Sequence, residues 1–355
     1  MATKLCVLFG GKSSEHEVSC MSAYNILKNL DKEKYEIIKF GITKTGATWL
    51  YTGDDESIKD GTWESHDCTA CVISHCPKTE GLLKLLPDGT YEKIKVDVFF
   101  PVLHGKNGED GTIQGVFELA QIPYVGNEVL GSALCMDKIF TKVVLESAGI
   151  ATAPGFYITK SENNEEKANE KIEKSFGYPV VVKPSNAGSS VGVSLVEERA
   201  ELKKALDVAF LEDRRVLVEK KIDKRELECA VLGDHEAASA SVIGEVITLS
   251  KMYDYTTKYE DAATKTQIPA EIDEDLSDKL RELAVRAFLA CDCKGLARVD
   301  FFVENESNKI YLNEINTLPV FTNISMYPML WGATGIGYTE LLDRVIELAI
   351  QEAKE

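Results

Sequence analysis

The chain lacks long apolar stretches and an excess of basic residues. No run of about 18 apolar residues occurs among its 355 residues, so a membrane span is not expected. The segment Met1–Ser19 lacks the apolar core and small-residue cleavage site of a secretory signal, so we expect a cytoplasmic location. The net charge is −18, which disfavours nucleic acid and anionic membranes as partners. An anionic ligand must therefore be held by local lysines or arginines.

Cysteine is not scarce, but it does not form a disulfide framework. Nine cysteines in a cytosolic chain are expected to be thiols. One cluster, His66, Cys68, Cys71, His75 and Cys76, includes a Cys-x-x-Cys spacing that suits a metal. No second pair of that spacing follows it. The cluster is therefore either a structural zinc site or, as we favour, a surface hairpin with free thiols.

The pattern of elements predicts an α/β protein with three domains, because 355 residues exceed one ordinary core. Residues 1–126 alternate strand and helix patterns and predict a parallel sheet. Residues 127–219 predict a small α+β unit, which opens with one helix over about Leu130–Ala148. Residues 220–355 predict a further domain. Its irregular stretch, residues 250–269, is rich in tyrosine and predicts a functional lid rather than a disordered linker.

The segment Arg298–Pro319 predicts a hairpin with a polar face. Two strands, Ala297–Glu304 and Lys309–Asn316, flank a polar turn. Strand side chains alternate, so pairing would gather the oxygen donors Asp300, Glu314 and Asn316 beside the Arg298 guanidinium. Such oxygen donors suit Mg²⁺. The alternative is an edge hairpin with a solvated polar face.

Four further segments suggest ligand contacts, and each also has an ordinary structural interpretation. Lys183 precedes a loop of small residues with Ser189 and Ser190, which lets backbone N–H groups approach an anion, although it is no Walker A motif. The strand ending at Glu219 could hold an adenine on its exposed backbone. Lys138 follows Met136-Asp137 in a helical region, where lysine is usually solvated. Glu15 begins a helix after Gly10-Gly11, where an acid also complements the helix dipole.

Six segments in one order make the chain similar to a known family: GGKSSEHEVS, HGKNGEDGTIQG, KPSNAGSSVGVS, YDYTTKY, RVDFF and LNEINTLP. In these it resembles the ATP-grasp enzymes and, among them, the D-alanine–D-alanine ligase family. The resemblance runs nearly from end to end. It implies a three-domain ATP-grasp fold whose first domain has a parallel sheet.

The resemblance implies sites for ATP and for two Mg²⁺ or Mn²⁺ ions. The residues matching phosphate contacts are Lys138, Lys183, Ser190 and Lys258. Those matching adenine and ribose contacts are Glu219, Lys220, Ile222 and Glu226. Asp300, Glu314 and Asn316 match the metal ligands.

The resemblance also implies residues for two amino acids. Glu15 matches the residue that binds the first ammonium, and Ser189 and Tyr259 match its hydrogen-bonded partners, which clamp the lid. Ser325 matches the position that holds the second carboxylate. Arg298 and the N–H of Val320 match the donors to a tetrahedral oxyanion.

The activity implied is ATP-dependent ligation of two D-alanines through an acyl phosphate, for peptidoglycan precursors. The alternative within the family is a D-alanine–D-serine or D-alanine–D-lactate ligase. Met326 favours D-alanine over D-serine, because the D-serine enzymes usually carry arginine at that position. Tyr259 fits a dipeptide ligase better than a D-lactate ligase. The alternative from another class is a non-enzymatic ATP-binding module. The family also implies a homodimer and leaves activation by K⁺ open.

One position departs from the family. After Leu318-Pro319 the family usually has glycine, and this chain has Val320. A β-branched residue does not readily adopt a positive φ. The oxyanion donor would therefore be misplaced if the site needs a conformation that only glycine adopts, and retained if it does not.

Overall fold

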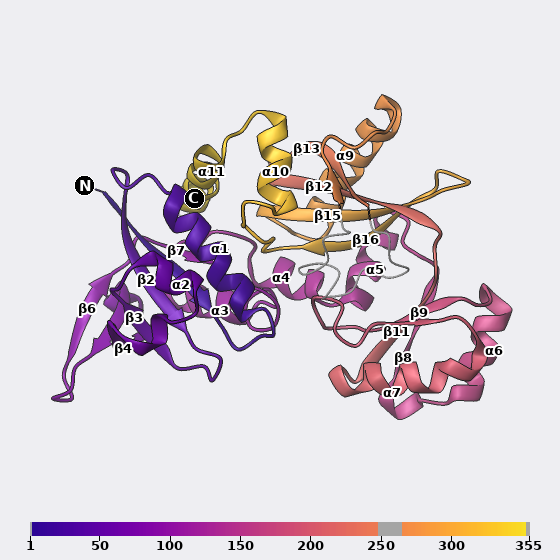
Figure 1. Ribbon diagram of the computed structural model, residues 1–355, viewed down its shortest axis with the longest axis horizontal. Helices are drawn as coiled ribbons and strands as arrows, with labels where there is room; N and C mark the ends of the chain where they lie inside the picture. The colour runs from indigo at the N-terminus through magenta and orange to yellow at the C-terminus, as the bar shows by residue number, and fades with distance from the viewer. Residues whose placement is uncertain (1, 248–264, 353–355) are drawn as a thin grey trace.

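Three β-sheets organise the chain in the computed structural model, which describes residues 2–247 and 265–352 (Figure 1). The first sheet has the order β6-β5-β4-β3-β2-β1-β7. One end of it, where β1 pairs with β2 and β7, is parallel, and the other four strands extend it antiparallel. The predicted parallel sheet is therefore confirmed for these three strands, and the sheet as a whole is mixed. The strands are β1 Thr3–Gly10, β2 Tyr35–Ile42, β3 Thr48–Tyr51, β4 Cys68–Ile73, β5 Gly81–Leu85, β6 Tyr91–Lys95 and β7 Val98–Pro101.

Helices from both ends of the chain cover the first sheet. Helix α1, His16–Asn29, follows a turn in which Gly10 and Gly11 have φ of 89° and 103°. A Cβ on Gly10 would lie 2.2 Å from the Ile42 carbonyl oxygen, so this turn requires glycine. The C-terminal helix α11, Tyr338–Glu352, lies beside α1 (Figure 1) and shares its core. The other helices of this region are α2 Asp55–Lys59 and α3 Thr112–Ala120.

A small antiparallel sheet with the order β10-β9-β11-β8 forms the second unit. Helices α6, Glu165–Ser175, and α7, Leu202–Glu212, cover it and bury a separate apolar core (Figure 1). Strand β10 is short, since turns occupy residues 191–193 before it. The strands are β8 Gly155–Thr159, β9 Val180–Pro184, β10 Ser194–Val196 and β11 Arg215–Lys220.

The third sheet is antiparallel, with the order β14-β13-β12-β15-β16. Part of the predicted lid belongs to it, because Lys265–Gln267 forms β14 against β13 rather than irregular chain. The rest of that stretch, up to residue 264, lies outside the described residues. The remaining elements are β12 Lys224–Gly233, β13 Ser239–Ile247, β15 Gly295–Glu304, β16 Ile310–Asn316, α9 Glu274–Ala290 and α10 Met326–Thr334.

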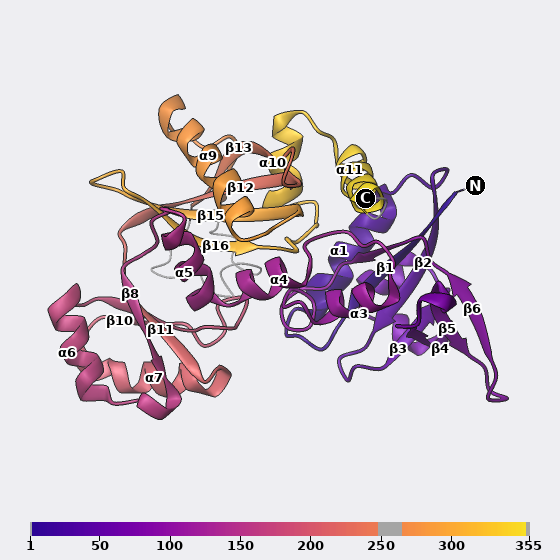
Figure 2. The same ribbon diagram turned by 180° about the vertical axis from the view of Figure 1, so that it is seen from behind.

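The predicted helix over residues 130–148 is wrong in one respect, because it is two helices. Helices α4, Val129–Met136, and α5, Lys138–Ser147, meet at Asp137, whose φ of −92° and ψ of 100° are not helical. The Asp137 side chain accepts hydrogen bonds from the N–H groups of Ile139 and Phe140, both at 3.2 Å. A side chain that caps the second helix interrupts an otherwise continuous apolar pattern. Helix α4 lies beside α3 of the first region, and α5 lies between the second and third sheets (Figure 2).

The cysteine and histidine cluster lies in β4 and in the segments on either side of it. Cys71 is fully buried, and the Cys68 thiol donates to the Trp63 carbonyl oxygen over 3.3 Å. In residues 2–247 and 265–352, no three His, Cys, Asp or Glu side chains are grouped in a way that could hold a metal ion. Within the same residues, no helix is both long and apolar enough to cross a membrane.

Candidate active site

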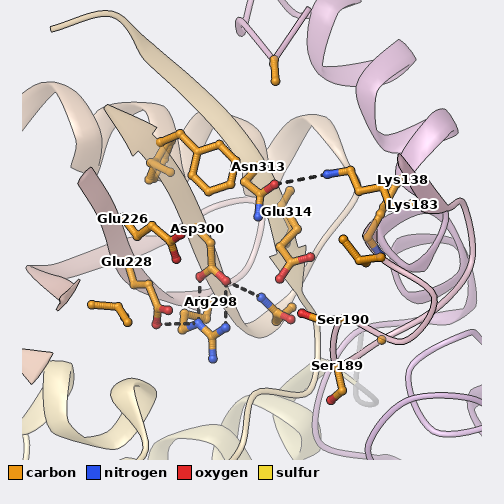
Figure 3. A pocket seen from close by; sticks show the side chains of 18 of the residues that line it. Lys138, Lys183, Ser189, Ser190, Glu226, Glu228, Arg298, Asp300, Asn313 and Glu314 are labelled. Atoms are coloured by element: carbon orange, nitrogen blue, oxygen red, sulfur yellow. Dashed lines mark hydrogen bonds and ion pairs between the residues drawn. The ribbon is translucent and has the colours of Figure 1, made fainter. Parts of the chain in front are cut away.

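A cavity of about 500 Å³ is lined by strands of the second and third sheets and by loop residues of the first region (Figure 3). Most of the residues singled out in the sequence line it together. Ser325 is not among the lining residues, and Tyr259 and Lys258 lie outside the described part of the chain. The predicted residues that line the cavity are Glu15, Lys138, Lys183, Ser189, Ser190, Glu219, Lys220, Ile222, Glu226, Arg298, Asp300, Glu314, Asn316 and Val320.

The predicted hairpin is confirmed, and its register brings the polar residues onto one face. Strands β15 and β16 pair so that Arg298 lies opposite Asn316 and Asp300 lies opposite Glu314. The register shifts between Asp300 and Phe301, and Asn313 is the extra residue of this β-bulge. A bulge re-aims side chains, and the Asn313 amide oxygen accepts a long hydrogen bond, 3.5 Å, from the Lys183 ammonium.

Two buried acids hold the Arg298 guanidinium. Asp300 accepts from its Nε and Nη2 atoms, both over 2.7 Å. Glu228, which the sequence did not single out, lies 2.8 Å from the same Nε (Figure 3). Burial alone would lower the pKa of Arg298, but Asp300 and Glu228 outweigh it and raise the pKa well above its usual value. Arg298 is therefore a fixed cation at the floor of the cavity.

The oxygen donors on this face are chemically suited to a divalent metal ion, although among the described residues no three carboxylates converge closely enough to form a metal site by themselves. Glu228, Asp300 and Glu314 are carboxylates opposite one another on three neighbouring strands. Like charges in that arrangement repel, and Arg298 supplies one positive charge against three negative ones. The Asn316 amide nitrogen donates to Asp300 Oδ2 over 2.9 Å, which directs its amide oxygen elsewhere. Hard oxygen ligands with surplus negative charge are what Mg²⁺ requires.

Two lysines and one acid line the opposite wall, and a third lysine, Lys142, pairs with the same acid without lining the cavity. Lys183 lies 2.5 Å from Glu219 Oε2, and Lys142 lies 2.7 Å from Glu219 Oε1. Burial opposes the ionisation of Glu219, but the two lysines outweigh it and lower its pKa. Lys142 was not singled out in the sequence, and its place one helical turn after Lys138 is the signal that could have found it. The Lys138 ammonium donates to the Ala187 carbonyl oxygen over 2.6 Å, and burial lowers its pKa.

The small-residue loop after β9 contacts the residue that precedes α1. Ser189 and Ser190 have φ of 48° and 58°, a left-handed conformation that is unfavourable outside glycine. The Ser189 hydroxyl donates to Glu15 Oε1 over 2.5 Å, and Glu15 is 7% exposed. Two members of the predicted Glu15–Ser189–Tyr259 clamp are therefore in contact.

A second acid, missed in the sequence, lies beside Glu15. The Gly105 N–H donates to Glu109 Oε2 over 2.6 Å, and both Glu109 and His104 line the cavity. Burial and then the charge of Glu15 raise the pKa of Glu109 to about 8. Burial lowers the pKa of His104, against the opposing effect of Glu15. The position of Glu109 in the glycine-rich loop after β7 could have identified it, since such loops carry active-site residues.

Two predicted site residues, Val320 and Ser325, follow the hairpin, and only Val320 lines the cavity. Val320 lines the cavity and is not among the described residues with positive φ, so its backbone has an ordinary conformation. Ser325 precedes α10, and its hydroxyl oxygen accepts from the Thr322 N–H over 3.0 Å. Its role in binding a carboxylate stays a prediction.

The chain matches two family models. The model described as "D-ala D-ala ligase N-terminus" matches residues 4–127, and the one described as "D-ala D-ala ligase C-terminus" matches residues 144–347. Among curated relatives, the chain is 50% identical to the D-alanine–D-alanine ligase of Acetivibrio thermocellus, covering 98% of this chain and 96% of that protein. It is 48% identical to the D-alanine–D-alanine ligase of Thermoanaerobacter pseudethanolicus, covering 99% and 98%.

Solved structures are similar over nearly the whole chain. The VanG D-Ala:D-Ser ligase from Enterococcus faecalis is 40% identical, with a TM-score of 0.90, and the match covers 98% of this chain and 100% of that one. The D-alanine–D-alanine ligase from Coxiella burnetii is 35% identical, with a TM-score of 0.87, covering 99% and 95%.

Proposed function

The chain belongs to the D-alanine–D-alanine ligase family and has its ATP-grasp fold, and from this premise we propose that it joins two D-alanines into D-alanyl-D-alanine for peptidoglycan precursors. ATP drives the reaction and is converted to ADP and phosphate. One observation carries the proposal. A single cavity combines an acid suited to an ammonium, Glu15, with lysines suited to phosphates, Lys138 and Lys183.

The first step activates a carboxylate, which is a poor electrophile. Glu15, fixed by Ser189, binds the ammonium of the first D-alanine and orients its carboxylate. A carboxylate oxygen attacks the γ-phosphorus of ATP, the bond from that phosphorus to the β-phosphate bridge breaks, and an acyl phosphate and ADP form. Lys138, Lys183 and the N–H groups around Ser190 bind phosphate oxygens, while Glu219, Lys220, Ile222 and Glu226 bind adenine and ribose. Lys258 is assigned to the transferred phosphate.

Two Mg²⁺ or Mn²⁺ ions, held by Asp300, Glu314 and Asn316, would supply positive charge to the phosphate oxygens during transfer. Three carboxylates facing one guanidinium support this assignment.

The second step forms the peptide bond. The amine of the second D-alanine attacks the acyl carbon, and phosphate leaves with the electron pair of the broken C–O bond. Arg298 and the Val320 N–H stabilise the tetrahedral oxyanion, and such a donor contributes about 3–4 kcal/mol in other acyl transfers. Ser325 is assigned to the second carboxylate, and Tyr259 to the lid that excludes water from the acyl phosphate.

A D-alanine–D-serine ligase is the second candidate, and the similarity to the VanG enzyme from Enterococcus faecalis favours it. D-Lactate as acceptor is less consistent with Tyr259. Met326, near the proposed second site, is 7% exposed, and a Cβ on Gly244 would lie 2.5 Å from its Cε, so its side chain packs tightly against β13. An apolar residue offers no hydrogen bond to a serine hydroxyl, which supports D-alanine.

The test is product identification. The chain is incubated with ATP, Mg²⁺ and D-alanine, alone or with D-serine or D-lactate as competing acceptor. We expect ADP release that requires D-alanine, equal amounts of D-alanyl-D-alanine, and the highest kcat/KM for D-alanine. A preference for D-serine would support the second candidate. ADP release that does not depend on any D-amino acid would support a non-enzymatic or unrelated ATP-binding role.

Three further features are part of the proposal. The reaction takes place in the cytoplasm, and the enzyme is a homodimer without a nucleic-acid or membrane partner. Light scattering coupled to gel filtration tests the dimer. Activity in sodium and potassium buffers of equal ionic strength tests for an effect of K⁺.

A further inference from the structure

The Arg298 guanidinium has two carboxylate partners, although the family motif RVD contains only one. Asp300, two residues further on β15, takes two hydrogen bonds from it. Glu228 comes from the neighbouring strand β12, and its Oε2 lies 2.8 Å from the Arg298 Nε (Figure 3). All three residues are 7–8% exposed. The second acid therefore has a specific partner inside the cavity wall and not a solvated surface position.

The strand pairing places Glu228 and Glu314 on opposite sides of Asp300. Glu228 pairs with Asp300 across β12 and β15, and Asp300 pairs with Glu314 across β15 and β16. Glu228 therefore lies on the side of Asp300 that faces away from Glu314. A cation held between β15 and β16 would contact Asp300 and Glu314 without requiring Glu228.

Asp300 serves two purposes at once under the proposed function. Both of its oxygens accept hydrogen bonds from Arg298, and Oδ2 also accepts from Asn316. A divalent ion bound to the same carboxylate would compete for these oxygens and would repel the guanidinium, because both are positive. Arg298 would then be held less firmly at the stage when it must bind the oxyanion.

We propose that Glu228 is a positioning residue that keeps Arg298 aimed into the cavity when Asp300 binds metal. This inference rests on the proposed function of the same site. Glu228 does not touch the substrate; it acts through Arg298 on the peptide-forming step. Phosphoryl transfer, which uses Lys138 and Lys183, does not depend on it.

The test separates the two steps in the variant Glu228→Gln, which keeps the shape and an acceptor oxygen but removes the charge. The first step is followed by scrambling of ¹⁸O from the β,γ-bridge of ATP, and the second by dipeptide formation. Loss of one oxyanion donor costs about 10²–10³ in rate, so a misplaced donor is expected to slow ligation at least tenfold. We expect scrambling to persist and the KM for ATP to stay within about twofold, because neither depends on Arg298.

The matched control is Glu245→Gln. Glu245 is another buried acid that lines the cavity and pairs with an arginine, Arg225, over 2.7 Å. If its replacement alters the rates, scrambling and ligation should change in the same proportion. A parallel loss of both activities in Glu228→Gln would mean a structural role only and would overturn the proposal.

A crystal structure of the Glu228→Gln protein with ADP and Mg²⁺ gives a readout that does not need activity. We expect the Arg298 side chain to leave its wild-type position when Mg²⁺ is bound. An unmoved Arg298 would contradict the proposal. If the glutamine variant does not fold, Glu228→Asp, which retains the charge on a shorter side chain, is tested in the same way. Failure of the wild-type enzyme to form a dipeptide would instead remove the proposed function.

Discussion

Single residues inside the cavity have pKa values set by their neighbours, and Glu109 is the clearest case. Burial and the nearby charge of Glu15 raise its pKa to about 8. In the unfolded chain a glutamate ionises near 4.3. Between these values the folded protein retains a proton that the unfolded chain has released. The contribution of Glu109 to stability is thus fully present below about pH 4.3 and is lost as pH rises through about 8.

The variant Glu109→Gln tests this sign. Wild-type protein should lose stability relative to the variant as pH rises from about 5 to about 8, because only the wild type binds the extra proton when folded. Urea unfolding of both proteins at several pH values measures the difference in unfolding free energy. Parallel stability curves would show that Glu109 titrates at an ordinary pKa.

Val320 occupies the position where the family usually has glycine. Val320 is not one of the described residues with positive φ, so its backbone conformation does not require glycine. We therefore expect Val320→Gly to leave kcat unchanged within about threefold. Steady-state kinetics at saturating substrates measure this. A rise in kcat of more than about tenfold would mean that valine misplaces the oxyanion donor.

At the level of elements, the junction of α4 and α5 depends on one side chain. Asp137 caps α5, accepts from the Ser185 hydroxyl over 2.7 Å, and pairs with Arg215 on β11. It thereby connects the helix that begins with Lys138 to the small sheet that carries Lys183.

Replacement of Asp137 by alanine should be costly. It removes a helix cap, about 1 kcal/mol, and leaves the arginine of a largely buried pair without its acid, about 3–5 kcal/mol. Asp137→Asn keeps a capping oxygen and should be less destabilising. Denaturant unfolding compares the three proteins. A loss below about 1 kcal/mol in the alanine variant would mean that the Arg215 pair contributes little.

The hairpin and the junction also show what the sequence could predict. Alternating side chains and a polar turn were sufficient to predict that Arg298, Asp300, Glu314 and Asn316 share one face, but the register that pairs them comes from the structure. The bulge at Asn313 leaves no pattern, because one inserted residue is invisible until two strands are aligned. The apolar pattern runs through Asp137, so the break between two helices could not be read from it.

Three functional candidates were missed for a related reason. Lys142, Glu109 and Glu228 acquire their roles from partners that are distant in the sequence: Glu219, Glu15 and Arg298. A charged side chain on a helix, loop or strand is most often solvated, and only the tertiary fold identifies the exceptions.

At the scale of the whole molecule, the cavity gathers local cations within an acidic chain. The chain carries a net charge of −18, yet Lys138, Lys183 and Arg298 line a single cavity together with several acids. Each region supplies part of the site: Glu15 precedes α1 in the first, Lys183 and Lys138 come from the second sheet and α5, and Asp300 and Glu314 come from the third sheet. In the proposed reaction, this arrangement transfers a phosphoryl group to a substrate carboxylate.

One isotope measurement tests this phosphoryl transfer. The enzyme is supplied with ATP, Mg²⁺ and D-alanine labelled with ¹⁸O in both carboxylate oxygens. An acyl phosphate requires that one carboxylate oxygen bridge to phosphorus and leave with the phosphate. We expect one ¹⁸O in each inorganic phosphate released, measured by mass spectrometry, in equal amount to the dipeptide. Unlabelled phosphate accompanying dipeptide formation would contradict the mechanism.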